Sequence, residues 1–292
     1  DVIREIHELY LEAGADIIET NTFGSTSIVL AEYNLQDRAY ELSYANARIA
    51  VEAAQKLSTA EHPRYVAGAM GPTTKTLSVT GGTTFEQLID AYAEQALAMI
   101  EAGVDALLLE TSQDALNVKA GSIGIMRAFE KSGRKLPIMI SGTIEPMGTT
   151  LAGQNIESFY ISLEHLKPIS IGLNCATGPE FMRDHIRTLS EIAGTAVSCY
   201  PNAGLPDEDG RYHESPESLA KKLAGFAEQG WLNIAGGCCG TTPDHIRAIA
   251  ETMRAYAPRK QAGSHPPAVS GIETVYVEPD NRPLMVGERT NV

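Results

Sequence analysis

Residues 234–245 read Ile234-Ala235-Gly236-Gly237-Cys238-Cys239-Gly240-Thr241-Thr242-Pro243-Asp244-His245. An apolar strand here runs into a glycine-rich turn that carries two adjacent thiols. Thr242 is a residue type that caps helices, and Pro243 suits the first helical position. The spacing therefore predicts a helix that begins just beyond the cysteines. The partial positive charge at the start of that helix favours a thiolate over a thiol nearby.

The same strand–turn–helix unit recurs at Ile171-Gly172-Leu173-Asn174-Cys175-Ala176-Thr177-Gly178-Pro179, again with a cysteine in the turn. Hydrophobic periodicity predicts that strands and helices alternate along most of the chain. The expected strands are 15–20, 65–70, 106–110, 138–141, 169–173, 196–199 and 231–235. The expected helices are 1–13, 38–57, one opening at Thr84, 115–131, 156–166, 179–192, 216–229 and 243–256.

The character of the predicted strands indicates the fold class. Each strand is short and apolar on both faces, as in a parallel sheet that helices cover. The segment 12–16 (EAGAD) is echoed at 101–105 (EAGVD), two strand–helix units later, and such repetition suits a barrel. Because the chain starts on a helix, we predict an α/β fold, a (β/α)8 TIM barrel whose first strand lies upstream of residue 1. A doubly wound sheet is the alternative, although no G-x-G-x-x-G follows a strand.

Composition excludes several classes of function. The 292 residues carry a formal net charge of −14, a balance that argues against binding to the phosphates of nucleic acid. No apolar stretch reaches the roughly 18 residues of a membrane span, and no signal peptide is visible. Four cysteines in a long, core-rich chain favour metal or catalytic roles over a disulfide framework. We therefore expect a reducing cytoplasm.

The composition changes after Tyr256, which sets the expected domain organisation. Residues 1–256 form the predicted barrel, and residues 257–270, which are rich in proline and polar residues, read as a linker. Residues 271–292 are too few for a domain and read as the opening of another one. The chain also lacks a start methionine, so we interpret it as a fragment.

The three cysteines in the strand-to-helix turns form the candidate site. In a parallel barrel the loops after the strands gather at one end, so Cys175, Cys238 and Cys239 can share one ion. Zinc suits thiolate ligands, and three protein ligands with an exchangeable fourth position are the catalytic pattern. The alternative is that they are ordinary buried cysteines, which are common in cores. Cys199 ends a strand without a glycine-rich turn, and we interpret it as a packing residue.

Polar residues at the other strand ends are candidates for binding a substrate. Carboxylates there can hold an ammonium group. These candidates are Glu19, Asn21, Glu110, Glu145, Asn174 and Asn202. His185 and His245 lie in predicted helices, and we interpret them as helix-surface residues rather than ligands. A phosphate-binding aldolase barrel would need a strand-end lysine, and Lys75 lies too far past its strand.

In combination these motifs resemble a known family. The sequences 172–175 (GLNC), 200–206 (YPNAGLP), 236–243 (GGCCGTTP) and 18–23 (IETNTF) look like the homocysteine-binding barrel of cobalamin-dependent methionine synthase. The tail 286–292 (VGERTNV) resembles the start of the next module of that family, the methyltetrahydrofolate-binding (pterin-binding) barrel. The first strand of the family, with its Asp-Gly-Ala loop, has no counterpart in this sequence.

The resemblance implies the roles of the candidate residues. Cys175, Cys238 and Cys239 would be the zinc ligands. The position of Asn202, at a strand end between the two cysteine loops, suggests the further hypothesis that its side-chain oxygen binds zinc in the absence of substrate. Glu110 would hold the amino group of homocysteine. The other predicted substrate-binding residues are taken from their positions at strand ends: Glu19, Asn21, Glu145 and Asn174. Methylcobalamin and 5-methyltetrahydrofolate would be bound by downstream modules of the same polypeptide.

The chemistry that the resemblance implies is methyl transfer to the thiolate of homocysteine, forming methionine. Three cysteine thiolates give a zinc centre a net charge of −1, so a bound substrate thiolate stays nucleophilic. Two alternatives stay open at this point. One is a cobalamin-independent homocysteine S-methyltransferase, and the other is a non-catalytic zinc-binding barrel.

Overall fold

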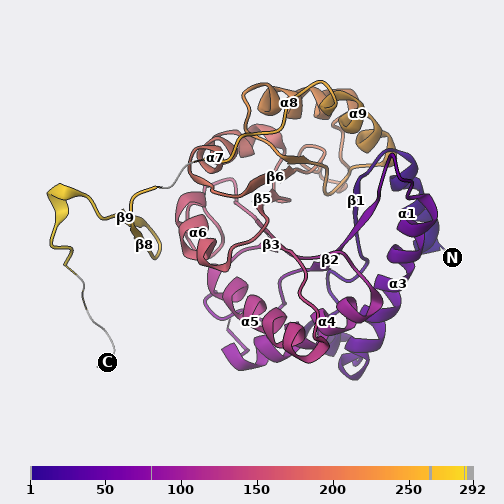
Figure 1. Ribbon diagram of the computed structural model, residues 1–292, viewed down its shortest axis with the longest axis horizontal. Helices are drawn as coiled ribbons and strands as arrows, with labels where there is room; N and C mark the ends of the chain where they lie inside the picture. Colours follow the sequence, from indigo (N-terminus) through magenta and orange to yellow (C-terminus); the bar gives the residue numbers. More distant parts are fainter. Residues whose placement is uncertain (1, 80, 263–264, 286, 288–292) are drawn as a thin grey trace.

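A computed structural model describes residues 2–79, 81–262, 265–285 and 287. Most of the tail motif 286–292 therefore lies outside the described residues. Helices form a ring around a curled set of parallel strands, and the C-terminal segment lies outside that ring (Figure 1). The strands of the ring are β1 (Ile17–Glu19), β2 (Tyr65–Met70), β3 (Ala106–Ser112), β4 (Ile138–Gly142), β5 (Ser170–Asn174), β6 (Ala196–Tyr200) and β7 (Ile234–Ala235).

The helices alternate with these strands as the periodicity predicts. They are α1 (Val2–Glu12), α2 (Ser27–Leu30), α3 (Ala39–Leu57), α4 (Phe85–Ala102), α5 (Ala115–Ser132), α6 (Ile156–Leu163), α7 (Pro179–Ile192), α8 (Pro216–Glu228) and α9 (Pro243–Met253). The predicted cap of α9 is confirmed, since Thr242 is its N-cap residue and Pro243 occupies the first turn. Short 3-10 turns at 31–33, 36–38 and 164–166 complete the connections.

The sheet has seven strands in the order β1-β2-β3-β4-β5-β6-β7, and every neighbouring pair is parallel. This confirms the barrel-type α/β fold. The strands bury apolar side chains on both faces. Leu109, Ile140, Ile171 and Val197 belong to the large core shared with the helices, whereas a small second cluster contains Ala67, Ala106, Leu108 and Met139. The carboxyl ends of all seven strands consequently meet at one mouth.

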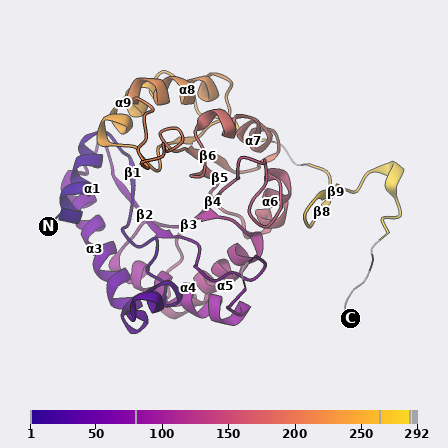
Figure 2. The ribbon, with the colours of Figure 1, turned by 180° about the vertical axis from the view of Figure 1, so that it is seen from behind.

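The sheet does not close into a full barrel within the described residues. β1 pairs only with β2, and β7 pairs only with β6. Between them lies a groove of about 1000 Å³ whose lining includes Ile18, Ile234 and residues of α1 and α9. Helices α1 and α9 nevertheless lie side by side along this groove (Figure 2). Tyr10 of α1 donates a hydrogen bond of 2.7 Å to the Thr241 carbonyl before α9. We call this groove the seam.

The segment expected to be a linker is anchored to the barrel. Arg259 is only 5% exposed, and its guanidinium donates to the carbonyls of Ser190, Ala193 and Thr195 at the end of α7. Such carbonyls lack helical partners at a helix C-terminus, so a buried cation is well placed there. The anchor holds the start of the segment 257–270 against the ring.

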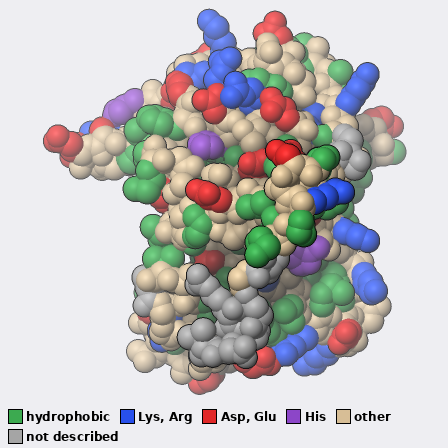
Figure 3. Space-filling view, turned by 90° about the vertical axis from the view of Figure 1, so that its left-hand side faces the viewer, with side chains coloured by type: hydrophobic (Ala, Val, Ile, Leu, Met, Phe, Trp, Pro, Cys, Tyr) green, Lys and Arg blue, Asp and Glu red, His purple; other side chains and the backbone are tan. Residues whose placement is uncertain are grey.

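A short hairpin follows this anchor. Strands β8 (Ala268–Ser270) and β9 (Thr274–Tyr276) pair antiparallel and lie beside α6. Tyr276 donates a hydrogen bond of 2.7 Å to Glu157, and Ser270 donates one of 2.9 Å to the Ser158 carbonyl. Figure 3 views the molecule from the side of this hairpin, where Lys and Arg side chains lie among Asp and Glu side chains. No helix in the described part of the chain is long and apolar enough to cross a membrane.

Candidate metal centre

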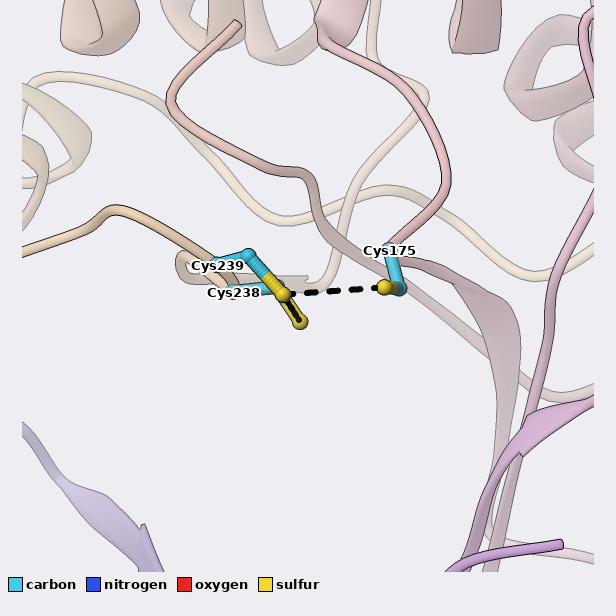
Figure 4. Close-up of side chains that lie close together, drawn as sticks. All are labelled: Cys175, Cys238 and Cys239. Atoms are coloured by element: carbon cyan, nitrogen blue, oxygen red, sulfur yellow. Dashed lines mark hydrogen bonds between the residues drawn. The ribbon is translucent and has the colours of Figure 1, made fainter. Parts of the chain in front are cut away.

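Three cysteine sulfurs converge at the mouth of the barrel. Cys175 comes from the loop after β5, and Cys238 and Cys239 come from the loop after β7, with their side chains pointing toward one another (Figure 4). Their sulfur atoms all lie within 4.8 Å of one another. The separation is 3.7 Å between the sulfurs of Cys175 and Cys239, and 3.9 Å between those of Cys238 and Cys239. All three are free thiols rather than disulfide partners.

The spacing of the sulfurs fits a tetrahedral metal ion. Thiolates bound at about 2.3 Å to a tetrahedral zinc are about 3.8 Å apart, which matches the separations of 3.7 and 3.9 Å. A set of three thiolates selects a soft or borderline cation over magnesium or calcium. The residues present therefore fit a zinc ion with a fourth position left for another ligand.

An unusual backbone conformation at Cys175 sets the direction of its side chain. Cys175 and Ala176 adopt left-handed conformations with φ values of 62° and 58°, which L-residues rarely take. Such strain at consecutive residues is typical of functional sites and persists only where the surroundings impose it. In β5, a Cβ at Gly172 would lie 2.0 Å from the Ser198 carbonyl oxygen, so only glycine allows β6 to approach this closely.

Backbone and side-chain contacts tie the paired cysteines to the loop after β6. Cys238 N donates to the Pro201 carbonyl at 2.8 Å, and Ala203 N donates to the Cys239 carbonyl at 2.9 Å. The side-chain oxygen of Asn202 accepts a hydrogen bond of 3.1 Å from Cys239 N. Asn202 thus lies beside the cluster, as the sequence predicts, and this oxygen holds the cysteine turn in place. Its role as a fourth ligand stays a prediction.

Asn174 connects the cysteines to the neighbouring strands from a fully buried position. Its oxygen accepts hydrogen bonds from Thr111 N at 3.0 Å and from the Ser141 hydroxyl at 2.7 Å. Its amide nitrogen donates to the Thr111 hydroxyl at 2.8 Å and lies 3.8 Å from Cys238 Sγ. Asn174 is therefore placed as a support of the metal centre, and its predicted contact with substrate stays untested.

The Cys239 thiol hydrogen bonds to both Cys175 and Cys238, and the proximity of the three thiols separates their proton affinities. Hydrogen bonds from Cys175 and Cys238 lower the pKa of Cys239 far below its ordinary value. Hydrogen bonds to Cys175 and Cys239 raise the pKa of Cys238. A cation that replaces the protons of these thiols is stabilised by all three sulfurs.

Two carboxyl groups lie side by side at the same mouth. The register of β3 against β4 shifts between Leu109 and Ser112, so Glu110 lies in an irregular stretch of its strand. Glu110 is buried and hydrogen bonded to Glu19 at the end of β1. Burial, followed by the charges of Glu19 and Cys175, raises the pKa of Glu110 well above its ordinary value. The two groups therefore share a proton when no cation lies between them.

The partner carboxyl opens onto the seam. Glu19 is exposed and lines the seam. Loss of hydration raises the pKa of its carboxyl to about 7, and the hydrogen bond to Glu110 acts in the opposite direction. A carboxyl pair of this kind favours a positively charged ligand, such as an ammonium group, because the cation removes the repulsion between the ionised forms.

The raised pKa of Glu19 predicts how folding stability depends on pH. Between its ordinary pKa of 4.5 and the folded value of about 7, the folded state keeps a proton that the unfolded state loses. Stability therefore falls as pH rises through this window. Glu19→Gln removes the effect and is expected to stabilise the fold at pH 8 by about 1 kcal/mol, a figure reduced for solvent screening. Urea unfolding at pH 5 and pH 8 measures it.

The matched control is Glu61→Gln, which removes an exposed carboxyl from the loop before β2. It is expected to keep the difference in unfolding free energy between pH 5 and pH 8 that the wild type has. Equal pH dependence in Glu19→Gln and in the wild type would contradict the shared proton.

Several other predicted residues lie away from the thiols or have different roles. Cys199 is fully buried in the core, which confirms its interpretation as a packing residue. Asn21 is exposed, and its amide lies 3.4 Å from Asn46 of α3. Glu145 is half-buried in the loop after β4, and no contact among the described residues joins it to the sulfurs. Both stay predictions as substrate-binding residues.

One histidine was interpreted wrongly. His245 is buried, not on the helix surface. Its ring accepts a hydrogen bond from Thr242 N at 3.1 Å and also lies 2.9 Å from the Glu214 carbonyl oxygen. It closes a capping box at the start of α9. His185 of α7 is half-buried, and burial lowers its pKa.

Sequence reasoning missed Tyr212, in the loop between β6 and α8. Its ring rests on Gly240, beside the paired cysteines, where a Cβ would lie 2.3 Å from a ring carbon. Gly240 also has a positive φ of 78°. In the sequence, Gly240 next to the cysteine pair indicated that another group approaches the backbone closely at this turn, but it did not identify Tyr212 as that group.

The fold and the site together define a class: a (β/α) barrel with a cluster of three cysteines, able to hold a metal ion, at the carboxyl ends of its strands. Comparison with known proteins makes this more specific. The sequence model described as homocysteine S-methyltransferase matches residues 1–253. The chain belongs to the homocysteine S-methyltransferase family.

Solved structures agree on the fold. The homocysteine methyltransferase MmuM from Escherichia coli is similar in its oxidized form, with a TM-score of 0.70 and 20% identity over 86% of this chain and 84% of that chain. Its metallated form has a TM-score of 0.69 and 21% identity, over 85% of this chain and 83% of that chain. At this level of identity the likeness supports the barrel fold alone.

Proposed function

We propose that this chain binds homocysteine through its thiol at a zinc ion held by Cys175, Cys238 and Cys239, and prepares it for methylation to methionine. The observation that carries the proposal is the meeting of three sulfurs within 4.8 Å at the mouth of a barrel of this family. The alternative of scattered core cysteines does not account for that meeting.

The chemistry begins from the weak acidity of the substrate. A free thiol has a pKa of about 8.5, so little of it is thiolate at pH 7. Zinc, when bound, ionises a coordinating thiol at neutral pH. Three anionic cysteines leave surplus negative charge on the centre, and neutral histidine ligands in their place would quench the substrate sulfur more strongly. The chain therefore supplies a ligand set that keeps the fourth sulfur nucleophilic.

The carboxyl pair orients the substrate in this proposal. Glu110 and Glu19 lie at the same mouth as the thiols, and the charge of Cys175 acts on Glu110. The ammonium group of homocysteine replaces their shared proton and makes charge-assisted hydrogen bonds to them. With the thiol at the metal and the ammonium at the carboxyls, the amino acid is held at two points, which fixes the direction of its sulfur.

The methyl donor in this proposal is methylcobalamin carried by a downstream module, and 5-methyltetrahydrofolate is bound by the module that residues 271–292 would begin. The support is the resemblance of the tail 286–292 to the start of that module. A cobalamin-independent methyltransferase is the second candidate, favoured by membership of a family named for homocysteine S-methyl transfer in general. Formation of methionine from free methylcobalamin, and not from S-methylmethionine, supports the cobalamin-dependent candidate. Formation of methionine from S-methylmethionine, and not from methylcobalamin, supports the cobalamin-independent one.

We also propose the reducing cytoplasm as the compartment. Two of the site's thiols lie with their sulfurs only 3.7 Å apart, within easy reach of oxidation to a disulfide. A disulfide would remove two of the three metal ligands, so the site needs a reducing environment.

X-ray absorption at the zinc edge tests the function directly. Homocysteine is expected to replace a light-atom ligand by a sulfur, which takes the centre from three sulfur neighbours to four. Homoserine, which carries a hydroxyl in place of the thiol, serves as the matched control and is expected to leave the sulfur number unchanged. A sulfur number that stays at three with saturating homocysteine would contradict the proposal and favour the non-catalytic zinc barrel.

A further inference from the structure

The loop after β6 lies between the two cysteine turns, one carrying Cys175 and the other carrying the cysteine pair. On one side, the Asn202 N–H donates to the Thr177 carbonyl at 3.2 Å, two residues beyond Cys175. On the other side, the Ala203 N–H donates to the Cys239 carbonyl at 2.9 Å. The separation of the two cysteine turns therefore depends on how firmly this loop is held.

One ammonium group joins the end of this loop to the start of α7. Lys222 of α8 donates a hydrogen bond of 2.5 Å to the Glu214 carboxylate and also forms an ion pair with Glu180. Glu214 lies at the end of the loop after β6, and Glu180 lies in the first turn of α7, just beyond the Cys175 turn. Lys222 thus connects the segments that carry and flank the two cysteine turns.

The Glu214 end of this connection is fixed to the cysteine pair. The Glu214 side chain is only 12% exposed. Its backbone N–H donates to the Ala203 carbonyl at 3.2 Å, and its carbonyl oxygen lies 2.9 Å from the His245 ring at the start of α9. Since Ala203 in turn contacts Cys239, a displacement of Glu214 is transmitted to the cysteine pair by two backbone hydrogen bonds.

The Glu180 end lies where the two loops touch. A Cβ at Gly178, the residue that caps α7, would lie 3.3 Å from a Glu180 carboxylate oxygen and 3.2 Å from the Gly204 Cα in the loop after β6. The two carboxylates that share the ammonium are therefore close to this contact. Without the cation between them they would repel each other and push the loops apart.

We propose that Lys222 is a positioning residue whose ion pairs with Glu180 and Glu214 hold the two cysteine turns at the separation that a zinc ion requires. The inference rests on the metal site of the proposed function, but it concerns the assembly of that site and not the methylation. Ligands that are already held in place lose less freedom when the metal binds. Groups that support metal ligands in this way contribute about 10–100-fold to metal affinity.

The zinc affinity of the substrate-free protein tests this inference. Lys222→Met removes the charge and keeps much of the apolar stem, and it is expected to weaken zinc binding about tenfold. Competition with a chromophoric zinc chelator measures the affinity. Lys222→Arg keeps a cation between the two carboxylates and is expected to restore most of the affinity.

The matched control is Lys221→Met. Lys221 is the neighbouring residue of α8, is exposed, and forms no ion pair with any residue that the structure describes. This variant makes the same chemical change in the same helix and is expected to bind zinc as the wild type does.

Two further measurements separate positioning from a general loosening of the fold. Lys222→Met combined with Glu180→Gln removes the repulsion between the carboxylates, so it is expected to recover part of the lost affinity. Cobalt(II), which binds thiolates and absorbs light through those bonds, reports the ligand set. At saturation its spectrum in Lys222→Met is expected to match that of the wild type, because all three thiolates still bind.

An unchanged zinc affinity in Lys222→Met overturns the inference. A loss that Lys222→Arg does not restore, or a saturated cobalt spectrum with fewer thiolates, also overturns it. If Lys222→Met does not fold, Glu180→Ala decides: weaker zinc binding supports the inference, and wild-type affinity overturns it. The tenfold loss supports it even if homocysteine adds no sulfur to the zinc, a result that would contradict the proposed function alone.

Discussion

Cys238→Ser is expected to strip zinc from the protein and to abolish methyl transfer. A serine hydroxyl is a hard, protonated ligand at neutral pH, whereas the site is built around soft thiolates. Loss of a supporting hydrogen bond at a metal site already costs 10–100-fold in affinity, so loss of a ligand is expected to cost at least about 100-fold. Metal analysis after dialysis against a chelator measures the change.

Cys199→Ala is the matched control for the loss of a thiol. Cys199 lies fully buried in β6, away from the metal ligands, so its removal costs packing energy but no ligand. Its zinc content is expected to equal that of the wild type, with a lower unfolding temperature. Full zinc retention in Cys238→Ser would refute the three-cysteine assignment.

The second large effect is expected at the buried carboxyl. Glu110→Gln removes the charge that the substrate ammonium pairs with, and is expected to weaken homocysteine binding by about 100-fold, or about 3 kcal/mol. The zinc content is expected to stay unchanged, because Glu110 contributes no ligand. Calorimetric titration of the zinc-loaded protein with homocysteine measures the affinity.

A thiol without the amino group makes this test specific. 4-Mercaptobutyrate has the carboxylate and thiol of homocysteine and lacks only the ammonium. The wild type is expected to prefer homocysteine strongly, whereas Glu110→Gln is expected to bind the two thiols with similar affinity. Glu61→Gln serves again as the control and is expected to keep the preference. If Glu110→Gln also keeps it, another group holds the ammonium.

Much of the fold could be predicted because its signals are local. Short runs that are apolar on both faces predict buried parallel strands, and each lies where expected. Capping residues mark helix starts in the same way: Thr84 and Gln87 form the capping box of α4, and Ser215 caps α8. The cysteine cluster was predictable from one further rule, that parallel strands bring their carboxyl ends to the same mouth.

The details of the site depend on contacts that no local pattern encodes. The register shift around Glu110 belongs to the pairing of β3 with β4, and the Glu110–Glu19 bond joins two strands far apart in sequence. Tyr212 lies in an irregular loop, so its position over Gly240 follows from tertiary packing alone. His245 was assigned to the surface because helical periodicity did not include the loop that covers it.

The hairpin β8–β9 was missed for a different reason. Its strands are three residues each, too short for a periodicity signal, and they lie beside α6, which is far from them in sequence. Residues 257–270 looked like a linker because they are rich in proline, yet composition does not reveal the buried anchor at Arg259.

The seam between β1 and β7 leaves backbone groups of both strands open to a further strand. Each of these strands presents backbone donors and acceptors without a partner strand on that side in the described chain. A single strand laid along the seam would pair with both edges at once and complete the ring of strands around the core.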